Sequence, residues 1–298
     1  MKTVIAISGP TGVGKTALAI SLANHFQTEI ISCDSRQFYR EMSIGVAKPT
    51  LDELSLAQHH FISFLSIEEE YTAGMFSRQA RAKIQDLFLT NEVIVVVGGS
   101  MLYMDALLYG LDELPGDREV RNILNERSEN EGLEVLVKEL QLKDPEFAAQ
   151  VDLENAHRVI RALEVIQLTG KPFSELRTQS SDAINAEIFH VFLLGEREWL
   201  YNRINVRVDK MVEEGLFEEV QGLQSLKHLQ ALNTVGYKEI FRHLGGECSK
   251  EEAIVEIKKN TRNYAKRQMT WYRNKPHVRQ FDAQKGDVSA EIISLVAR

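Results

Sequence analysis

The chain has 298 residues, 44% hydrophobic and 26% charged, which is enough to bury one large domain or a main domain with a smaller addition. Its net charge of −8 argues against broad nucleic-acid binding, and its two cysteines, Cys33 and Cys248, make neither a disulfide framework nor a metal site. No apolar run approaches the roughly 20 residues of a membrane helix, and the N-terminus does not read as a secretory signal. We therefore expect a cytoplasmic protein with reduced thiols and no membrane partner.

Short runs of apolar, mostly β-branched residues are the predicted strands: Val4–Ser8, Glu29–Cys33, Val93–Val97 and Phe189–Leu194. They lack polar alternation, which is typical of strands buried on both faces of a parallel sheet. Helical patterns at Lys15–Phe26 and Ala73–Phe88 lie between the first three runs. Alternation of strand and helix predicts βαβ units with right-handed crossovers.

The segment 111–187 differs in character from the rest of the chain. It is charged, has no buried-strand run, and shows helical periodicity at Val120–Asn130, Leu133–Leu142 and Arg158–Leu168. We interpret it as a helical insertion in a core formed by residues 1–110 and 188–298. Beyond the fourth predicted strand, Arg197–Gly222 and Lys250–Tyr272 are predicted helices.

A phosphate-binding motif, G-x-x-x-x-G-K-[ST], follows the first predicted strand and opens the first helix. Its residues are Gly9, Pro10, Thr11, Gly12, Val13, Gly14, Lys15 and Thr16. The glycines let backbone N–H groups turn toward phosphate oxygens, and the helix N-terminus adds partial positive charge. Lys15 supplies a cation, and the Thr16 hydroxyl is a candidate Mg²⁺ ligand. The motif and the predicted elements together indicate an α/β fold, with a P-loop NTPase-like parallel sheet core and an inserted, mainly helical domain.

Two further segments follow predicted strands, at the sheet edge where ligands bind in open α/β folds. Asp34 comes directly after the second strand. Its carboxylate is a candidate Mg²⁺ ligand through water, a candidate general base, or a helix cap. Gly98, Gly99 and Ser100 follow the third strand, where an ordinary P-loop NTPase often has an aspartate. This departure weakens an ATPase interpretation and favours phosphate binding without nucleotide hydrolysis.

The segment Lys258–Phe281 is locally basic in an acidic chain, with eight Lys and Arg residues and no acidic one. It is either a solvated helix face or a docking surface for nucleic acid. Trp271 and Tyr272 within it either stack on bases or anchor the core. The adjacent His59 and His60 point in different directions and have no third ligand nearby, which favours a hydrogen-bonding role over metal binding.

The order of motifs resembles that of the tRNA dimethylallyltransferases, close to the bacterial form, over nearly the whole chain. The blocks are Gly9–Thr16, Asp34–Tyr39, Ile44–Pro49, His59–His60, Gly98–Tyr103, His157–Glu164, Val235–Glu239 and Thr261–Gln268, which continues to Trp271. The resemblance implies transfer of the dimethylallyl group from dimethylallyl diphosphate to N6 of the adenosine 3′ of the anticodon, in tRNAs reading codons that begin with U. Diphosphate would be the leaving group, and a monomer is expected.

The resemblance also implies residue roles. Asp34 would be the general base, Ser100 would stand where the family usually has Thr, and Arg207 would neutralise the departing diphosphate. The diphosphate-binding residues would be Gly9, Thr11, Gly12, Val13, Gly14, Lys15 and Thr16, with Thr16 also on Mg²⁺. The tRNA-binding residues would be Asp34, Ser35, Arg36, Gln37, Ser100, His157, Arg158, Val159, Ile160, Arg161, Lys266 and Arg267. The insertion would clamp the anticodon stem-loop.

Two departures from the family pattern stand out. Val46 replaces a common Thr, and these 298 residues contain no Cys/His zinc module of the kind seen in eukaryotic relatives. Three alternatives remain: prenylation of free AMP, ADP or ATP, a small-molecule kinase, and a non-catalytic RNA-binding module. The insertion and the basic segment argue against the first, the absent aspartate after Val97 against the second, and Lys15, Thr16 and Asp34 against the third.

Overall fold

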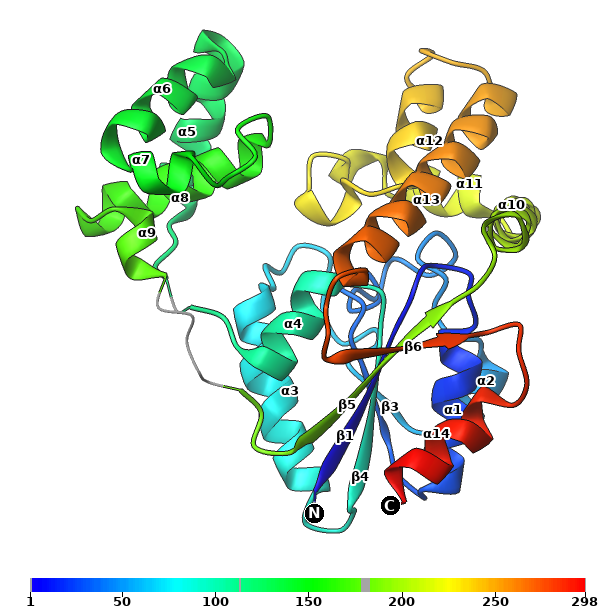
Figure 1. The fold of residues 1–298 in the computed structure, drawn as a ribbon. Coiled ribbons are helices and arrows are strands. Elements are labelled where there is room, and N and C mark those ends of the chain that lie inside the picture. Colours follow the sequence, from blue (N-terminus) through cyan, green and yellow to red (C-terminus); the bar gives the residue numbers. More distant parts are fainter. Residues whose placement is uncertain (1, 113, 178–182, 298) are drawn as a thin grey trace. The chain divides into compact units, whose positions relative to one another are not determined.

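The structure is a computed structural model that describes residues 2–112, 114–177 and 183–297. The chain divides into two compact units. One, called here the core unit, comprises the residues up to Leu108 and from Ile184 onward, and the other, the helical unit, is Tyr109–Ala183 (Figure 1). The insertion predicted from the sequence spans residues 111–187.

The core unit is built on a six-stranded sheet, as far as the described residues show, in which every pairing is parallel. The strand order is β3-β2-β4-β1-β5-β6. The strands are β1 (Thr3–Ser8), β2 (Ile30–Ser32), β3 (His59–His60), β4 (Val93–Val97), β5 (Glu187–Leu194) and β6 (Val278–Asp282). The predicted α/β class with a parallel sheet is confirmed.

Helices cover both faces of the sheet, with α3 and α4 on one side and α1 and α14 on the other (Figure 1). Val4–Ile7 are fully buried between these layers, as the unbroken apolar run predicts. The helices of the core unit are α1 (Lys15–His25), α2 (Leu51–Leu56), α3 (Ala73–Leu87), α4 (Met101–Tyr109), α10 (Arg197–Glu213), α11 (Leu216–Gly222), α12 (Tyr237–Leu244), α13 (Lys250–Tyr272) and α14 (Val288–Val296), with short 3₁₀ turns at Gln224–Leu226 and Gln230–Leu232.

Three features of the core unit differ from the prediction. Strands β3 and β6 were not expected, because β3 has only two residues and β6 mixes polar and apolar residues without a continuous apolar run. Both are edge strands with one neighbour, where a long apolar run is not needed. The single helix expected over Arg197–Gly222 is two helices, since Gly215 adopts a left-handed conformation, with φ of 101°, between α10 and α11.

The helical unit has its own hydrophobic core. Its helices are α5 (Arg118–Glu131), α6 (Leu133–Lys143), α7 (Pro145–Ala148), α8 (Ala156–Thr169) and α9 (Phe173–Leu176). Leu124, Leu140 and Leu163 pack together in that core. The helical periodicity of segment 111–187 therefore corresponds to real helices with a shared apolar side.

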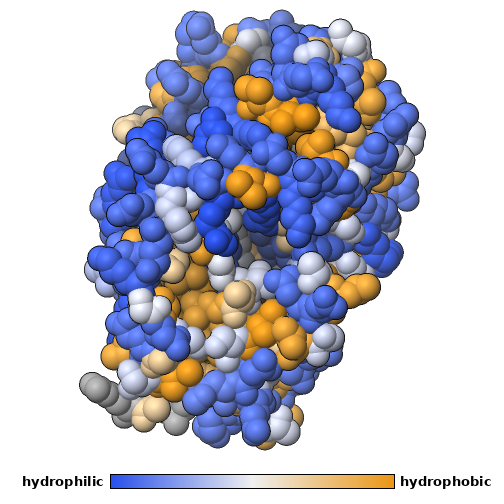
Figure 2. Space-filling view, turned by 90° about the vertical axis from the view of Figure 1, so that its right-hand side faces the viewer, coloured by the Kyte–Doolittle hydropathy of each residue, from blue (hydrophilic) through white to orange (hydrophobic). Residues whose placement is uncertain are grey.

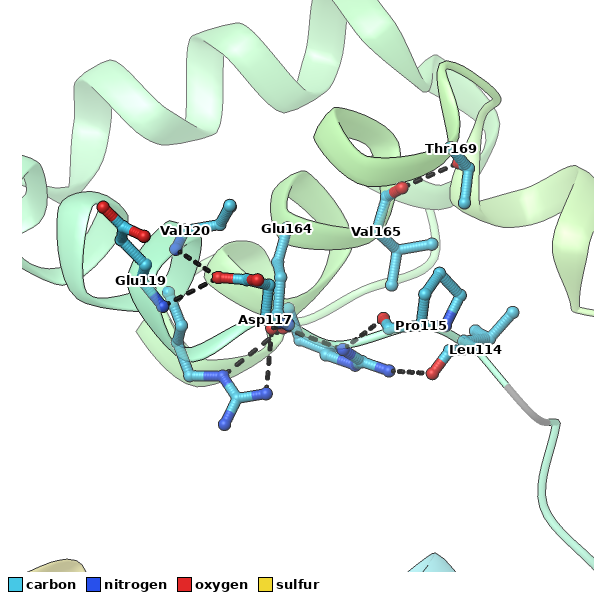
Figure 3. Close-up of polar contacts among 10 residues, drawn as sticks. Leu114, Pro115, Asp117, Glu119, Val120, Glu164, Val165 and Thr169 are labelled. Atoms are coloured by element: carbon cyan, nitrogen blue, oxygen red, sulfur yellow. Dashed lines mark hydrogen bonds and ion pairs between the residues drawn. The ribbon is translucent and has the colours of Figure 1, made fainter.

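A fully buried carboxylate joins α8 to the chain that enters α5. Glu164 forms ion pairs with Arg121 at 2.9 Å and Arg161 at 2.8 Å, and accepts from the backbone N–H of Asp117 at 2.8 Å. Figure 3 shows Glu164 at the centre of this network. Because a buried charge is tolerated only when it is paired and hydrogen-bonded, these contacts fix the start of α5 against α8.

Replacing Gly98 by alanine is expected to destabilise the core unit by about 3 kcal/mol or more, because overpacking a close backbone contact forces the strands apart. A Cβ on Gly98 would lie 1.8 Å from the carbonyl oxygen of Cys33, at the point where β2 and β4 end. Gly74→Ala in α3 is the control, since its Cβ meets nothing closer than 3.7 Å. Urea denaturation measures both, and equal unfolding free energies for the two variants would contradict the role of Gly98.

Candidate active site

The P-loop turns sharply between β1 and α1. Gly12 and Gly14 have φ angles of 84° and 112°, a left-handed region in which side chains with a Cβ are strained. Gly14 is the residue before the first turn of α1, so the backbone N–H groups of that turn face the loop. Lys15 Nζ donates to the carbonyl oxygens of Gly9 at 3.0 Å and Pro10 at 3.1 Å. The loop therefore holds its own cation beside the helix N-terminus, an arrangement suited to an anion.

The carboxylate of Asp34 faces this cation. A Cβ on Gly99 would lie 3.3 Å from Asp34 Oδ2 and 3.9 Å from Lys15 Nζ, so the missing side chain lets both groups approach. Burial lowers the pKa of Lys15 to about 8, although Asp34 opposes this. Burial raises the pKa of Asp34 above its ordinary value, against the opposing effects of Lys15, the Arg36 backbone N–H and Arg207. A carboxylate with a raised pKa is a stronger proton acceptor than an ordinary aspartate.

Ser100 connects the ends of two strands. Its Oγ accepts from the backbone N–H of Ser35 at 2.8 Å and donates to Ser35 Oγ at 3.0 Å. The Ser100 side chain is buried, and these bonds hold the segment after β2 against the segment after β4. Asp34 thereby keeps a defined position next to the P-loop.

Helix α10 contributes two arginines to the site. Arg207 Nη1 donates to Thr11 Oγ1 at 3.0 Å, and Arg203 Nε donates to the carbonyl oxygen of Gly12 at 2.8 Å. Burial lowers the pKa of Arg207, and Asp34 is the largest opposing influence. Both guanidinium groups thus lie on the loop expected to bind phosphate, where positive charge stabilises an anion.

Helix α13 contributes a side chain that the sequence analysis missed. Gln268 is buried, accepts from the Thr11 backbone N–H at 2.9 Å and donates to the Gly99 carbonyl oxygen at 2.9 Å. Tyr264 also donates its hydroxyl to Gly99, at 3.0 Å. Both residues belong to a quoted motif block, but nothing in their residue types indicated a contact with segments more than 160 positions away in the chain.

A cavity of about 260 Å³ in the core unit opens beside these groups. Asp34, Ser100 and Arg207, the three predicted catalytic residues, all line it, together with Thr11 of the P-loop. Apolar side chains form much of the remaining wall: Val46, Ile204, Val208, Met211, Leu216 and Ile257. The cavity therefore has a charged end suited to phosphate and an apolar part suited to a hydrocarbon group.

Comparison with known proteins agrees with this arrangement. Residues 37–275 match the sequence profile of the family described as IPP transferase. A relative from Christiangramia forsetii, named tRNA dimethylallyltransferase, is 49% identical over 94% of this chain and 93% of its own length. This chain belongs to the IPP transferase family. A second relative, tRNA dimethylallyltransferase 1 of Bacteroides thetaiotaomicron, is 44% identical over 99% of this chain and 96% of its own.

Solved structures of similar proteins support the family assignment. The tRNA isopentenylpyrophosphate transferase of Bacillus halodurans has a TM-score of 0.73 and 37% identity, covering 100% of this chain and 96% of its own. A eukaryotic dimethylallyltransferase acting on tRNA has a TM-score of 0.81 and 28% identity, covering 99% of this chain and 78% of its own. This member of the IPP transferase family therefore shares its fold with these proteins over nearly the whole chain.

In this family member, the residues predicted to bind tRNA differ in their accessibility. Lys266 and Arg267 are exposed on α13, and the Arg267 guanidinium lies 5.6 Å from the centre of the Tyr264 ring. Arg36 donates to the carbonyl oxygen of Gln230, and Gln37 is engaged by the backbone of residues 46 and 47. Lys266 and Arg267 therefore offer cations to a phosphate, whereas Gln37 already has structural bonds.

The residues of α8 that are predicted to bind tRNA, 157–161, also differ in their accessibility. His157 and Arg158, in the first turn of α8, are exposed. Val159 and Ile160 are buried, and their side chains pack in the core of the helical unit. Arg161 bonds to Glu164 and to the carbonyl oxygens of residues 114 and 115 (Figure 3). Of the residues of α8 predicted to bind tRNA, His157 and Arg158 are therefore the ones with exposed side chains.

Other aromatic and histidine residues of this chain have structural contacts. Trp271 donates to Asp105 Oδ2 at 2.8 Å and so ties α13 to α4. Tyr272 is buried, and its ring packs against that of Phe192 in β5. His60 pairs with Glu29, and His59 bonds to Ala57 at 2.8 Å. No group of three or more potential metal-binding side chains is found in the described ranges. None of the helices described there is long and apolar enough to cross a membrane.

The face on the right-hand side of Figure 1, which carries α2, α10 and α14, is mostly hydrophilic, with hydrophobic patches beside a central hollow (Figure 2). Exposed apolar side chains such as Leu51 on α2 and Val206 on α10 occur in this part of the core unit. Scattered exposed hydrophobic residues are normal on a protein surface, and we assign them no function.

Proposed function

We propose that this chain transfers the dimethylallyl group of dimethylallyl diphosphate to the exocyclic N6 of the adenosine 3′ of the anticodon, in tRNAs reading codons that begin with U. The observation that carries the proposal is the cavity with two chemical halves, in which Asp34 and Arg207 lie beside the P-loop and apolar side chains line the rest. A prenyl diphosphate has the same two halves. The names of the relatives, tRNA dimethylallyltransferase, support the same reaction.

The chemistry is a substitution at an allylic carbon. A bond forms between N6 of adenosine and that carbon, the bond between the carbon and the diphosphate oxygen breaks, and diphosphate leaves with the electron pair. The N6 proton passes to Asp34, whose raised pKa suits it to accept a proton from a weakly nucleophilic amine. Ser100 supports this step by holding the segment that carries Asp34.

Charge that builds on the leaving diphosphate is stabilised by the P-loop, Lys15 and Arg207. The Thr16 hydroxyl, in the first turn of α1, suits a hard cation such as Mg²⁺, and bound Mg²⁺ would add Lewis-acid neutralisation. The described residues contain no cluster of three or more metal-binding side chains, and we propose that substrate oxygens and water complete the coordination of the ion. A cation that shares its ligands with phosphate is common at P-loops.

Recognition of tRNA is proposed to involve both units, each by its exposed basic or polar side chains. The helical unit would clamp the anticodon stem-loop through the first turn of α8, and Lys266 and Arg267 would position phosphates. The target base is already unpaired in an anticodon loop, so its extrusion costs less than opening a duplex. We propose that the chain acts on tRNA in the cytoplasm, as a monomer.

The deciding experiment mixes the purified protein with Mg²⁺, labelled dimethylallyl diphosphate, and either unmodified tRNA or AMP. Label in tRNA and not in AMP is expected. Label in AMP alone would transfer the function to adenylate prenylation. Phosphoryl transfer or ATP hydrolysis without prenylation would support a kinase instead.

Converting both Lys266 and Arg267 to glutamate is expected to weaken tRNA binding about tenfold or more and to flatten its salt dependence, because fewer counterions are released per complex. The control is Lys83→Glu with Lys285→Glu, which makes the same change in net charge on α3 and beyond β6. Filter binding across a salt series measures both. An unchanged slope for the α13 variant would remove these residues from the interface.

A further inference from the structure

The Glu219 carboxylate on α11 has four hydrogen-bond donors around it. Its Oε2 accepts from the backbone N–H groups of Ser43 at 2.9 Å and Ile44 at 2.8 Å. Its Oε1 accepts from the Gly45 N–H at 3.0 Å and from the Tyr237 hydroxyl at 2.5 Å. Three successive backbone N–H groups that converge on one anion form a nest, which holds the loop in one conformation.

The loop that Glu219 holds is part of the cavity wall. Gly45, whose N–H is bonded to Glu219, lines the cavity together with the next two residues, Val46 and Ala47. Gln37 supports the same loop from its other side, with its Nε2 donating to the carbonyl oxygens of Val46 at 3.2 Å and Ala47 at 3.0 Å. Ala47 has a φ of 48°, a conformation that a residue with a Cβ keeps only where its surroundings impose it.

Another part of the wall comes from α11, which carries Glu219, and from the residue before Tyr237 of α12. Leu216 of α11 and Gly236, just before α12, also line the cavity. The Tyr237 ring packs so closely on the loop that a Cβ on Gly45 would lie 2.5 Å from it. Glu219 and Tyr237 therefore link the loop at residues 45–47 to the part of the wall formed by Leu216 and Gly236.

We propose that Glu219 is a positioning residue that sets the width of the apolar part of the cavity and so restricts the prenyl group to the five-carbon size. Glu219 does not line the cavity and acts through residues 45–47. This inference rests on the proposed function, because it takes the prenyl diphosphate as the occupant. When the carboxylate is replaced by an amide, the NH₂ group faces N–H donors, and the loop loses its anchor.

The test compares Glu219→Gln with Glu218→Gln, its exposed neighbour on the same helix. Steady-state transfer to tRNA is measured with dimethylallyl diphosphate and with geranyl diphosphate, its ten-carbon homologue. Glu219→Gln is expected to raise KM for dimethylallyl diphosphate about tenfold, with kcat within about twofold, since ground-state binding is lost. The ratio of kcat/KM for geranyl to that for dimethylallyl diphosphate should rise about tenfold, and Glu218→Gln should leave all three values unchanged.

Tyr237→Phe removes only the hydroxyl donor and keeps the ring against Gly45, so it tests the same tie if Glu219→Gln folds poorly. A shift of the chain-length ratio in the same direction, by about threefold, is expected. A folded Glu219→Gln or Tyr237→Phe protein with the wild-type ratio would overturn the inference, as would a loss of kcat alone. If the wild-type protein and Glu218→Gln transfer no dimethylallyl group to tRNA, the proposed function itself fails.

Discussion

Replacing Asp34 by alanine is expected to lower kcat for prenyl transfer by roughly 10²–10⁴-fold, the usual contribution of a positioned general base. Asp34 lines the cavity together with Arg207. The reacting amine must lose a proton, and the described lining of the cavity contains no other carboxylate that could accept it. Binding of tRNA should persist, because the other residues predicted to bind it, such as Lys266 and Arg267, are unchanged. Single-turnover transfer and filter binding separate the two effects.

Asp86→Ala is the matched control for this prediction, since it removes an exposed carboxylate on α3. It should leave both turnover and tRNA binding at wild-type values. Near-normal turnover by Asp34→Ala would show that the proton leaves by another route, and loss of tRNA binding would make Asp34 a recognition residue instead.

The pH dependence of kcat/KM follows from the same carboxylate. A general base acts only when deprotonated, so activity falls as the pH drops through the pKa of Asp34. Because burial raises that pKa, the acid limb should begin at a higher pH than for an ordinary exposed aspartate. A profile that stays flat down to pH values near 4 would contradict a raised pKa at the reacting carboxylate.

Replacing Lys15 by methionine is expected to lower kcat/KM for dimethylallyl diphosphate by roughly 10²–10³-fold, as for loss of one charge-stabilising donor in a preorganised site. Methionine keeps the length and apolar character of the stem, so the change isolates the charge and the bonds to Gly9 and Pro10. Lys83→Met on α3 is the control. Equal kinetics for both variants would show that Lys15 does not reach the diphosphate.

Lys15→Met should also move the acid limb of the pH profile. The ammonium of Lys15 lowers the pKa of Asp34, so its removal raises that pKa further. The limb is therefore expected at higher pH in the variant than in the wild type. A shift to lower pH would mean that the titrating group is not Asp34.

The local structure of the first strand and of the P-loop that follows it was predictable from the sequence. The spacing Gly9–Thr16 after an apolar run specifies its own local structure, because glycines at left-handed positions and a helix N-terminus are short-range properties. The parallel sheet was equally predictable, since buried strands need unbroken apolar runs. Asp34 and Ser100 were singled out because they follow predicted strands, whereas Arg207 was named only from the family resemblance. The strand order β2-β4-β1 brings Asp34 and Ser100 beside the P-loop.

Other contacts depended on long-range packing, which no local pattern encodes. Gln268 reads as an ordinary helix residue, and only the packing of α13 over the P-loop brings it to Thr11 and Gly99. Val159 and Ile160 belong to a motif block, yet they lie on the face of α8 that packs against the neighbouring helices and are therefore buried. Nothing in the sequence indicated the role of Glu219, because its carboxylate binds three backbone N–H groups of a loop more than 170 residues earlier in the chain. The sequence by itself thus determined the chemistry at the ends of the strands, where short-range geometry decides, and the tertiary structure decided the width and support of the cavity, because those depend on which distant elements pack together.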